Sequence, residues 1–394
     1  MRDVRSGVGK LILRQLGDLI FLLVCATVAA AQSAASPEHN GTSDPLPAGS
    51  WRFIVSGDSR NCGDIVMPTI AAHSAQFAPA FYWHLGDLRA VYKIDEDMAA
   101  EAQNRGNVLT CGNYQRRAWD DFVENQIAAF GDLPFYLGIG NHEVIPPKNE
   151  DAFKHHFEDW LNLPTLAHQR YADNEPSQPE PYFHWIQGGV DFIYLDNANN
   201  FFSEGQLTWF FRRLTSARNN PAVLSIVVGM HEALPDSLGN DHSMGDGSDP
   251  RGISTGEAVY KALLAFRNKK PVYVLASHSH FYMENIFDTD KLKQNGAVPL
   301  PGWIAGTAGA ARYKLPGNLP ATSNARKDVY GYLLATVAAD GTIDFKFQEV
   351  TESDVPQPVK RRYPEKFIPW CFKHNSQNVD AHDPDPPCPA RRYR

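Results

Sequence analysis

Five short polar motifs occur along the chain, and each directly follows a run of apolar residues. Between them they supply Asp, Asn and His side chains: Gly57-Asp58, Gly86-Asp87, Gly140-Asn141-His142, His231 and His278-Ser279-His280. Carboxylate and amide oxygens combined with imidazole nitrogens form a ligand set of the kind that holds two divalent metal ions. Such ions neutralise phosphate oxygens and lower the pKa of a bound water to about 7. The motif residues therefore indicate a site for two divalent metal ions and metal-assisted chemistry.

The apolar runs before the motifs predict the strands that position them. These runs cover residues 53–55, 81–85, 135–139, 224–228 and 272–275. Short β-branched or aromatic runs bounded by Gly and Pro are typical of strands. Ligands of an open α/β sheet bind beyond the carboxyl ends of its strands. We therefore expect the motif residues to meet along one edge of one sheet.

In their order the motifs resemble those of the calcineurin-like metallophosphoesterase superfamily, nearest the purple acid phosphatase branch. The family's GD, GDxx, GNH(E/D), isolated His and GHxH stand here as Gly57-Asp58-Ser59-Arg60, Gly86-Asp87-Leu88-Arg89, Gly140-Asn141-His142-Glu143, Gly229-Met230-His231 and Ser277-His278-Ser279-His280. A lone Gly-Asp pair is a common turn, but all five motifs in order at strand ends are specific. The resemblance spans roughly residues 51 to 350.

The resemblance implies two transition-metal ions as cofactors, drawn from zinc, manganese and iron, and it implies their ligands. Asp87 would bridge the two ions, since a carboxylate offers two oxygens and a negative charge. The first ion would add Asp58 and His280, and the second Asn141, His231 and His278. The amide of Asn141 suits a metal because its carbonyl oxygen is a hard ligand without charge. The implied nucleophile is a hydroxide between the ions.

The resemblance also makes His142 the acid beside the metals. In the family the His of Gly-Asn-His-Glu lies over the phosphate and is able to protonate the leaving oxygen. Imidazole suits that role because its pKa lies near working pH. Glu143 would then orient His142 or hydrogen-bond nearby backbone.

Two positions depart from the family pattern. Many relatives carry His two residues after the first Asp, and purple acid phosphatases carry Tyr three residues after the second; here these positions are Arg60 and Ala90. The first metal therefore lacks its usual third private ligand, and no tyrosinate-to-iron absorption is expected. Arg60 is a candidate catalytic residue that holds a phosphate oxygen bidentately. A salt bridge to Asp64 or another nearby carboxylate is the equally weighted alternative.

Each ligand also has a structural interpretation. Asp58 and Asp87 could be turn formers or helix N-caps, and a lone His231 is more often a core histidine. The order of the motifs favours the ligand role for all of them. The structural role is kept for the remaining histidines in expected strands and helices, namely His73, His84, His155 and His156.

Two other classes of function remain as alternatives. Gly57-Asp58-Ser59 resembles the nucleophile block of GDSL esterases, with Ser59 attacking an ester and Asn141 in the oxyanion hole. Those enzymes need a late Asp-x-x-His, and no His in the chain has Asp three residues before it. The third class is a non-catalytic metal- or phosphate-binding protein, for which Arg60 is the only support.

The segments between the strands predict an α/β fold. Apolar residues recur at helical spacing over 65–77, 116–130, 151–161 and 204–218. Late strands are expected over 329–337 and 342–350, with a hairpin at Asp340-Gly341. The resemblance implies that such late strands complete the second of two facing mixed sheets. The expected architecture is a four-layer α/β/β/α sandwich with the metal site at the strand C-terminal edge.

Length and composition agree with a globular enzyme. At 394 residues and 43% apolar content, the chain can bury a large core. A net charge of −8 argues against a nucleic-acid-binding surface, whereas a small phosphorylated substrate held by metals remains compatible. We favour a phosphomonoesterase over a phosphodiesterase, with specificity carried by the insertions 93–114, 145–182 and 234–256. The oligomeric state is left open.

The first residues have the composition of an export signal. A basic leader precedes an apolar core over 19–28 and a small-residue cleavage site at 29–31. We expect a signal peptide over 1–31, a linker over 32–50, a metallophosphoesterase domain over 51–350 and a C-terminal extension over 351–394. The apolar run is short for a membrane span, so we expect a periplasmic or secreted protein with no stable span after cleavage. An uncleaved anchor remains the alternative.

Four cysteines follow the expected cleavage site, and an even number in an exported chain indicates two disulfides. Four cysteines allow three connectivities. Cys62 and Cys111 lie in loops that leave the same expected sheet edge, so we predict that they pair. Cys371 and Cys388 would then close a Pro-rich C-terminal loop.

Overall fold

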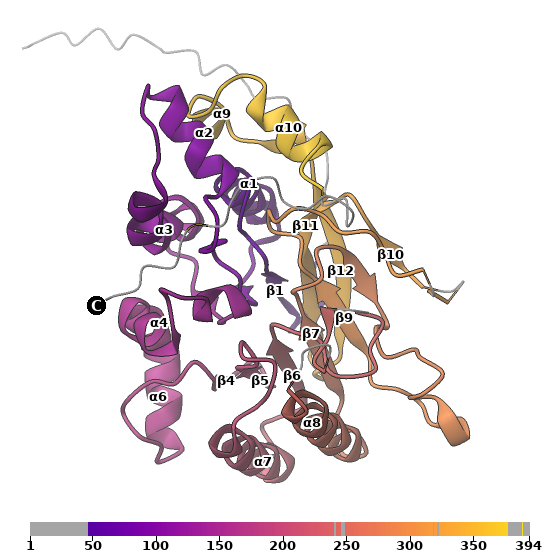
Figure 1. Ribbon diagram of the computed structural model, residues 1–394. Coiled ribbons are helices and arrows are strands. Elements are labelled where there is room, and N and C mark those ends of the chain that lie inside the picture. Colours follow the sequence, from indigo (N-terminus) through magenta and orange to yellow (C-terminus); the bar gives the residue numbers. More distant parts are fainter. Residues whose placement is uncertain are drawn as a thin grey trace, which may run out of the picture. The chain divides into compact units, whose positions relative to one another are not determined.

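Two mixed β-sheets form the centre of the molecule, and helices cover their outer faces (Figure 1). The computed structural model describes most of the chain: residues 46–239, 242–245, 249–317, 319–320, 323–376 and 388, except the side chain of residue 295. The signal expected over 1–31 and most of the linker expected over 32–50 lie outside the described residues. No helix in the described part combines the length and apolar character needed to cross a membrane.

The first sheet has five strands in the order β12-β11-β1-β2-β3. They are β1 (Trp51–Ser56), β2 (Tyr82–His84), β3 (Phe135–Leu137), β11 (Tyr330–Val337) and β12 (Ile343–Val350). Strands β1, β2 and β3 run parallel, and β11 pairs with β1 antiparallel. The predicted late hairpin is therefore present, but it completes the sheet of the first motifs. The expectation that it completes the other sheet was wrong.

The second sheet has seven strands in the order β10-β8-β9-β7-β6-β5-β4. They are β4 (Phe183–Gln187), β5 (Val190–Leu195), β6 (Ser225–Met230), β7 (Val272–Ala276), β8 (Tyr282–Glu284), β9 (Gly302–Ala305) and β10 (Ala325–Arg326). Strands β5, β6, β7 and β9 are parallel, whereas β4, β8 and β10 pair antiparallel with their neighbours.

Aromatic side chains fill the space between the two sheets. The rings of Phe53 on β1 and Phe192 on β5 meet edge to face at 5.0 Å. Trp83 on β2 and Trp185 on β4 meet in the same way at 5.3 Å. All four side chains are buried. Offset and edge-to-face ring pairs stabilise by about 0.5–1.5 kcal/mol beyond the area they bury, so these contacts fix the two sheets face to face.

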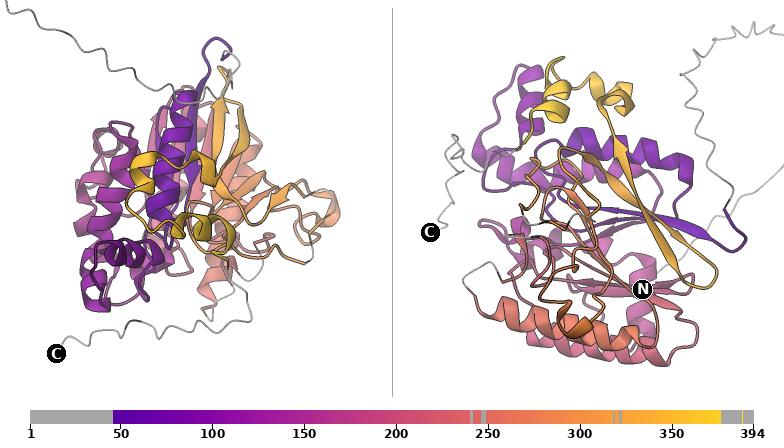
Figure 2. Two further views of the ribbon diagram at one scale, coloured as in Figure 1. Left: turned by 90° about the horizontal axis from the view of Figure 1, so that it is seen from above. Right: turned by 90° about the vertical axis from the view of Figure 1, so that its right-hand side faces the viewer.

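Helices complete the outer layers, as the views of Figure 2 show. Helix α1 (Gly63–Ser74) packs on β11 and β12, and α8 (Arg251–Arg267) packs on β7 beside α7 (Glu204–Asn219). The remaining helices are α2 (Glu96–Asn104), α3 (Cys111–Asn125), α4 (Glu150–His156), α5 (Glu158–Leu161), α6 (Pro164–Ala172), α9 (Gln357–Lys360) and α10 (Phe367–Lys373). Short 3-10 turns are η1 (Ala75–Phe77), η2 (Ile127–Phe130), η3 (Asn141–Val144), η5 (Gln294–Gly296) and η6 (Glu352–Asp354). The four-layer α/β/β/α sandwich is confirmed.

One predicted helix is divided in two. The pattern over 151–161 forms α4 and α5, which meet at Phe157. Phe157 is fully buried, with its ring 5.3 Å from that of Trp119 and 5.0 Å from that of Phe153. The chain leaves helical geometry at Phe157, and the ring lies in this aromatic cluster.

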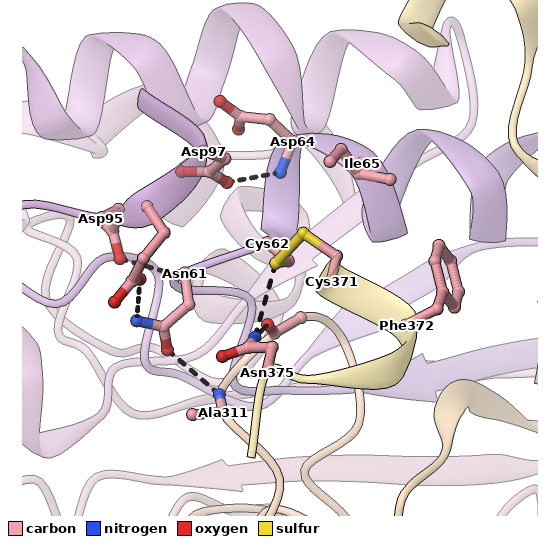
Figure 3. The surroundings of a disulfide bond; sticks show 12 residues. Asn61, Cys62, Asp64, Ile65, Asp95, Asp97, Ala311, Cys371, Phe372 and Asn375 are labelled. Carbon is pink, nitrogen blue, oxygen red and sulfur yellow. Dashed lines mark hydrogen bonds between the residues drawn. A yellow bond between two sulfur atoms is a disulfide. The ribbon is translucent and has the colours of Figure 1, made fainter. Parts of the chain in front are cut away.

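The disulfides join the C-terminal segment to the domain, so the predicted pairing was wrong. Cys62 bonds Cys371 and Cys111 bonds Cys388, over sequence separations of 309 and 277 residues. Figure 3 shows Cys371, on α10, reaching Cys62 at the start of α1. Asn375 supports the bridge by donating from Nδ2 to Gly309 O at 3.1 Å and to Tyr330 Oη at 2.8 Å. The prediction failed because it treated the C-terminal segment as a loop closed on itself, whereas α10 carries Cys371 to the start of α1.

We expect the Cys62–Cys371 bridge to matter for activity as well as stability. A Cys62→Ser, Cys371→Ser double variant should lower the free energy of unfolding by about 2–5 kcal/mol. It should also lower phosphatase activity, because Cys62 lies two residues from Arg60. The Cys111→Ser, Cys388→Ser double variant is the matched control, with a similar loss of stability and a smaller loss of activity. Urea titrations followed by circular dichroism, with parallel activity assays, measure both effects. Equal activity losses in the two variants would contradict this role.

Candidate metal centre

Strands of both sheets deliver the motif residues to one place. Asp58, Asp87 and Asn141 follow β1, β2 and β3 of the first sheet. His231 follows β6 and His278 follows β7, both in the second sheet. The expectation that the motifs share one edge of one sheet was therefore wrong. The carboxyl ends of the parallel strands of both sheets converge, and the site lies where they meet.

The backbone turns sharply at the motif residues. Asp58, Asp87 and His278 have φ angles of 62°, 61° and 62°. This left-handed region is sparsely populated by residues other than glycine. Outliers of this kind cluster at functional sites, where the surrounding structure holds them. The turns direct three side chains inward immediately after their strands end.

Glycines allow the motif loops to approach each other. A Cβ on Gly86, whose φ is 97°, would lie 2.6 Å from the backbone nitrogen of Gly140. A Cβ on Gly140 would lie 2.4 Å from Asp87 Oδ1. Because real Cβ atoms essentially never come within 3.0 Å of such neighbours, only glycine fits at both positions. The loops carrying Asp87 and Asn141 can therefore touch.

Asp87 is the buried centre of the site. Its Oδ1 accepts a hydrogen bond from the His142 backbone at 3.0 Å and lies 3.2 Å from His231 Nε2. Its Oδ2 lies 3.6 Å from His142 Nε2 and 3.7 Å from Arg60 Nε, and it has no hydrogen-bond partner. Burial raises the pKa of Asp87, but His142, His231 and Arg60 outweigh burial and hold that pKa well below its usual range. Asp87 is therefore an ionised carboxylate with a free oxygen.

Lone-pair atoms converge beside Asp87. One ligand atom from each of Asp58, Asp87, His231 and His278 lies within 4.8 Å of all the others. His231 Nε2 also lies 3.0 Å from Asn141 Oδ1 and 3.0 Å from His278 Nδ1. So many acceptors at one point, with Asp58 Oδ1 and Asp87 Oδ2 buried and without a hydrogen-bond partner, repel one another unless a cation lies between them. The residues present fit a divalent metal ion.

Carbonyl groups behind the imidazoles fix their orientation. His231 Nδ1 lies 3.0 Å from Leu85 O, His280 Nδ1 lies 2.6 Å from Ala311 O, and His142 Nδ1 lies 2.7 Å from Ala90 O. A carbonyl only accepts, so each Nδ1 carries a proton, and in the neutral ring each Nε2 presents its lone pair to the site. Metal-binding histidines are generally held in this way.

Glu143 joins two motif loops through backbone amides. Its Oε2 accepts from the nitrogens of Asp87 at 2.9 Å and Gly140 at 2.8 Å, and its Oε1 accepts from that of Leu88 at 3.0 Å. Glu143 was expected either to orient His142 or to hydrogen-bond nearby backbone, and the structure shows the hydrogen bonds to backbone.

Burial also shifts the pKa of several site residues. Burial and the charge of Arg60 lower the pKa of His142 to about 4. For His231, burial lowers the pKa, but Asp87 and Asp58 outweigh burial and raise it to about 10. The negative charge around His231 therefore attracts a positive charge, whereas burial and Arg60 disfavour a positive charge on His142.

Arg60 points into the site, away from Asp64. It is 4% exposed, and its Nη2 donates to His280 Nε2 at 2.9 Å. Asp64 instead pairs with the buried Arg89. Asp64 is therefore not the partner of Arg60. Another carboxylate, that of Asp87, lies 3.7 Å from Arg60 Nε, as the salt-bridge interpretation also allows.

Tyrosines that the motifs did not single out complete the surroundings. The Tyr313 ring stacks on His280 with centroids 3.9 Å apart. Burial raises the pKa of the Tyr313 hydroxyl, and the charge of Arg60 acts on it in the opposite direction. Tyr313 follows β9, a strand that was not predicted because its apolar residues lie in a Gly-rich segment. The only signal was the small-residue run 306–311 after an apolar stretch. Tyr92 lies beside His142, with ring centroids 5.3 Å apart.

The geometry around Ser59 argues against the esterase alternative. His84 Nε2 lies 3.0 Å from Ser59 Oγ, and both side chains are fully buried. However, the backbone nitrogen of Gly86 donates to His84 Nδ1 at 3.2 Å. In the neutral ring Nε2 therefore carries the proton and donates to Ser59, so His84 cannot accept the proton of a serine nucleophile. His84 keeps the structural role assigned from the sequence.

Comparison with known proteins identifies the family. The family model described as calcineurin-like phosphoesterase matches residues 62–282. A purple acid phosphatase from yellow lupin seeds is similar in fold, with 14% identity, a TM-score of 0.52 and coverage of 77% of this chain and 52% of that chain. GAP50 of Plasmodium has 14% identity and a TM-score of 0.48, over 76% of this chain and 84% of that chain. No curated protein matches the sequence. The chain belongs to the calcineurin-like phosphoesterase family.

Proposed function

We propose that this phosphoesterase is an exported, metal-dependent hydrolase of small phosphate esters. The convergence of lone-pair atoms from Asp58, Asp87, His231 and His278 within 4.8 Å carries the proposal. A divalent ion held there supplies Lewis-acid chemistry, because it polarises phosphoryl oxygens and acidifies the attacking water. The orphaned Asp87 Oδ2 and the oriented imidazoles would bind it.

The protein's own residues would orient the phosphate. His142 Nε2 faces the site beside Asp87, while its Nδ1 is fixed by Ala90 O. Burial and Arg60 lower the pKa of His142 to about 4, and the negative charge of a bound phosphate acts in the opposite direction. We infer that His142 acquires its proton together with the anionic substrate and transfers it to the leaving oxygen.

A phosphomonoester is the favoured substrate class. Arg60 and His142 flank Asp87 on its Oδ2 side, so two groups that bind anions face the same region. A phosphomonoester dianion carries more negative charge than a phosphodiester monoanion, so these two groups attract it more strongly. Which phosphomonoester this protein hydrolyses also depends on the loops around the site.

Export is supported by the disulfides. Both Cys62–Cys371 and Cys111–Cys388 bridge distant parts of the chain, and such bonds persist in oxidising compartments. We propose that residues 1–31 are a cleaved signal, 32–50 a linker, 51–350 the hydrolase domain and 351–394 an extension tied back by the disulfides. Peptide sequencing of exported protein should then begin at Gln32, and an intact Met1 would overturn cleavage.

A substrate panel on one metal-analysed preparation tests the proposed function. We expect turnover of p-nitrophenyl phosphate, slower turnover of bis(p-nitrophenyl) phosphate, and none of p-nitrophenyl acetate. A chelator should abolish the activity, and zinc or manganese should restore it. Asn141→Ala should lower metal affinity, because the amide oxygen is lost from the ligand group. Metal binding without turnover would favour a non-catalytic binding protein, and turnover without any metal would overturn the proposal.

A further inference from the structure

The half of the centre nearest Asp58 and His280 already contains a cation. Arg60 Nη2 lies 2.9 Å from His280 Nε2, and Arg60 Nε lies 3.7 Å from Asp87 Oδ2. The charge of Arg60 also acts on the carboxylate of Asp58. These are the three side chains that the motif pattern assigns to the first metal ion. The guanidinium therefore lies where that ion would have its ligands.

The hydrogen bond to His280 excludes a metal bond from the same atom. His280 Nδ1 lies 2.6 Å from a carbonyl oxygen, that of Ala311, so Nδ1 carries the proton. Nε2 then has a single lone pair, and arginine can only donate, so Arg60 uses that lone pair. A metal ion would need the same lone pair at about 2.0–2.1 Å. Arg60 and a first metal ion therefore compete for one atom.

Arg60 is held in place and keeps its charge. It is buried, its Nη2 donates to His280 Nε2, and the Tyr313 ring stacks on His280 at 3.9 Å. Arginine stays protonated in proteins, so it cannot become a ligand. A divalent ion beside it would face a like charge in a buried setting, where screening is weak. Position 60, where many relatives carry a metal-binding histidine, therefore holds a cation that repels a metal ion.

The other half of the centre keeps its ligands. Asp87, Asn141, His231 and His278 present lone pairs toward one another, with 3.0 Å between His231 Nε2 and both Asn141 Oδ1 and His278 Nδ1. No described arginine or lysine makes an ion pair with Asp87 other than Arg60. Four protein ligands suffice for one ion, with positions left for water and substrate.

Building on the proposed function, we propose that Arg60 takes the place of the first metal ion, so that the centre binds one divalent ion. That ion would lie among Asp87, Asn141, His231 and His278. Arg60 Nε is buried without a hydrogen-bond partner, so the guanidinium has a donor to offer a phosphate oxygen. A fixed organic cation and one metal ion would then share the work that two metal ions do in a dinuclear centre.

Metal counting tests this directly. The full chain, stripped with chelator and titrated with Mn²⁺ alone, should bind one ion and give the electron paramagnetic resonance signal of an isolated ion. Arg60→His, which restores a ligand and removes the charge, should raise the count from one to two and give a coupled pair. Arg60→Lys is the matched control: it keeps the charge and cannot ligate while protonated, so its count should stay at one. A coupled pair in the wild type, or one ion in a folded Arg60→His variant, would overturn the proposal.

Anomalous diffraction from wild-type crystals soaked in Mn²⁺ gives a second test that no variant can confound. One peak beside His231 and His278 supports the proposal, and a second peak between Asp58 and His280 overturns it. If the wild-type protein binds no metal, the proposed metal-dependent function is itself wrong. This outcome differs from a second metal peak, which would overturn only the proposal about Arg60.

Discussion

Asp87→Asn is expected to remove all bound metal and to lower kcat/KM by about 10³-fold or more. Asp87 is the fully buried carboxylate at the centre of the ligand group, and its ionised form is held by His142, His231 and Arg60. Asparagine keeps the shape and can still accept from the His142 backbone, but it loses the negative charge. A bound metal supplies several kcal/mol of transition-state stabilisation, and each 1.36 kcal/mol is a factor of ten in rate.

Elemental analysis and kinetics on the same sample would measure this. Asp344→Asn is the control, since Asp344 lies exposed on β12 beside Lys346 and should change neither metal content nor rate. Circular dichroism would establish that Asp87→Asn is folded. Full metal content with low activity would show that Asp87 acts on the substrate and is not a required ligand.

His142→Ala should leave metal content intact and lower kcat by about 10²–10⁴-fold, the usual contribution of a positioned acid. The side chain of His142 contacts Asp87 only at 3.6 Å, while the 3.0 Å bond to Asp87 comes from its backbone and survives. The loss should be largest for alkyl phosphates, whose leaving oxygen needs a proton. It should be smallest for p-nitrophenyl phosphate, whose leaving oxygen barely needs one.

A series of phosphomonoesters with graded leaving-group pKa values would measure the dependence. His156→Ala is a suitable control, because His156 lies on α4 beside Asp120 and away from the motif loops. Equal losses for every leaving group would defeat the acid role of His142. Such equal losses would assign His142 a role in binding phosphate, like the role proposed for Arg60.

The elements and the types of the site residues follow from local sequence. Strand patterns act over a few residues, so the apolar runs before Asp58, Asp87, Asn141, His231 and His278 indicate strands without reference to the rest of the chain. Gly-Asp and Gly-Asn pairs mark the turns that follow, because few residues tolerate such backbone. The order of the motifs then identifies the family and its four-layer fold. The strands that end in a polar motif were therefore predicted, whereas β9 and β10, which no such motif follows, were not.

The partner of each side chain depends on contacts between residues that are distant in the sequence. Only the tertiary structure decided these contacts. Cys62 bonds a residue 309 positions away, and Arg60 meets His280 across 220 positions. The division of the motif strands between two sheets is likewise a matter of topology, since a strand's own residues do not say which neighbour it pairs with. The sequence alone showed that position 60 is an arginine where relatives carry a ligand. Only the packing of β1, β7 and β9 around it placed its guanidinium on the lone pair of His280, because a side chain's partner is set by which strand ends converge.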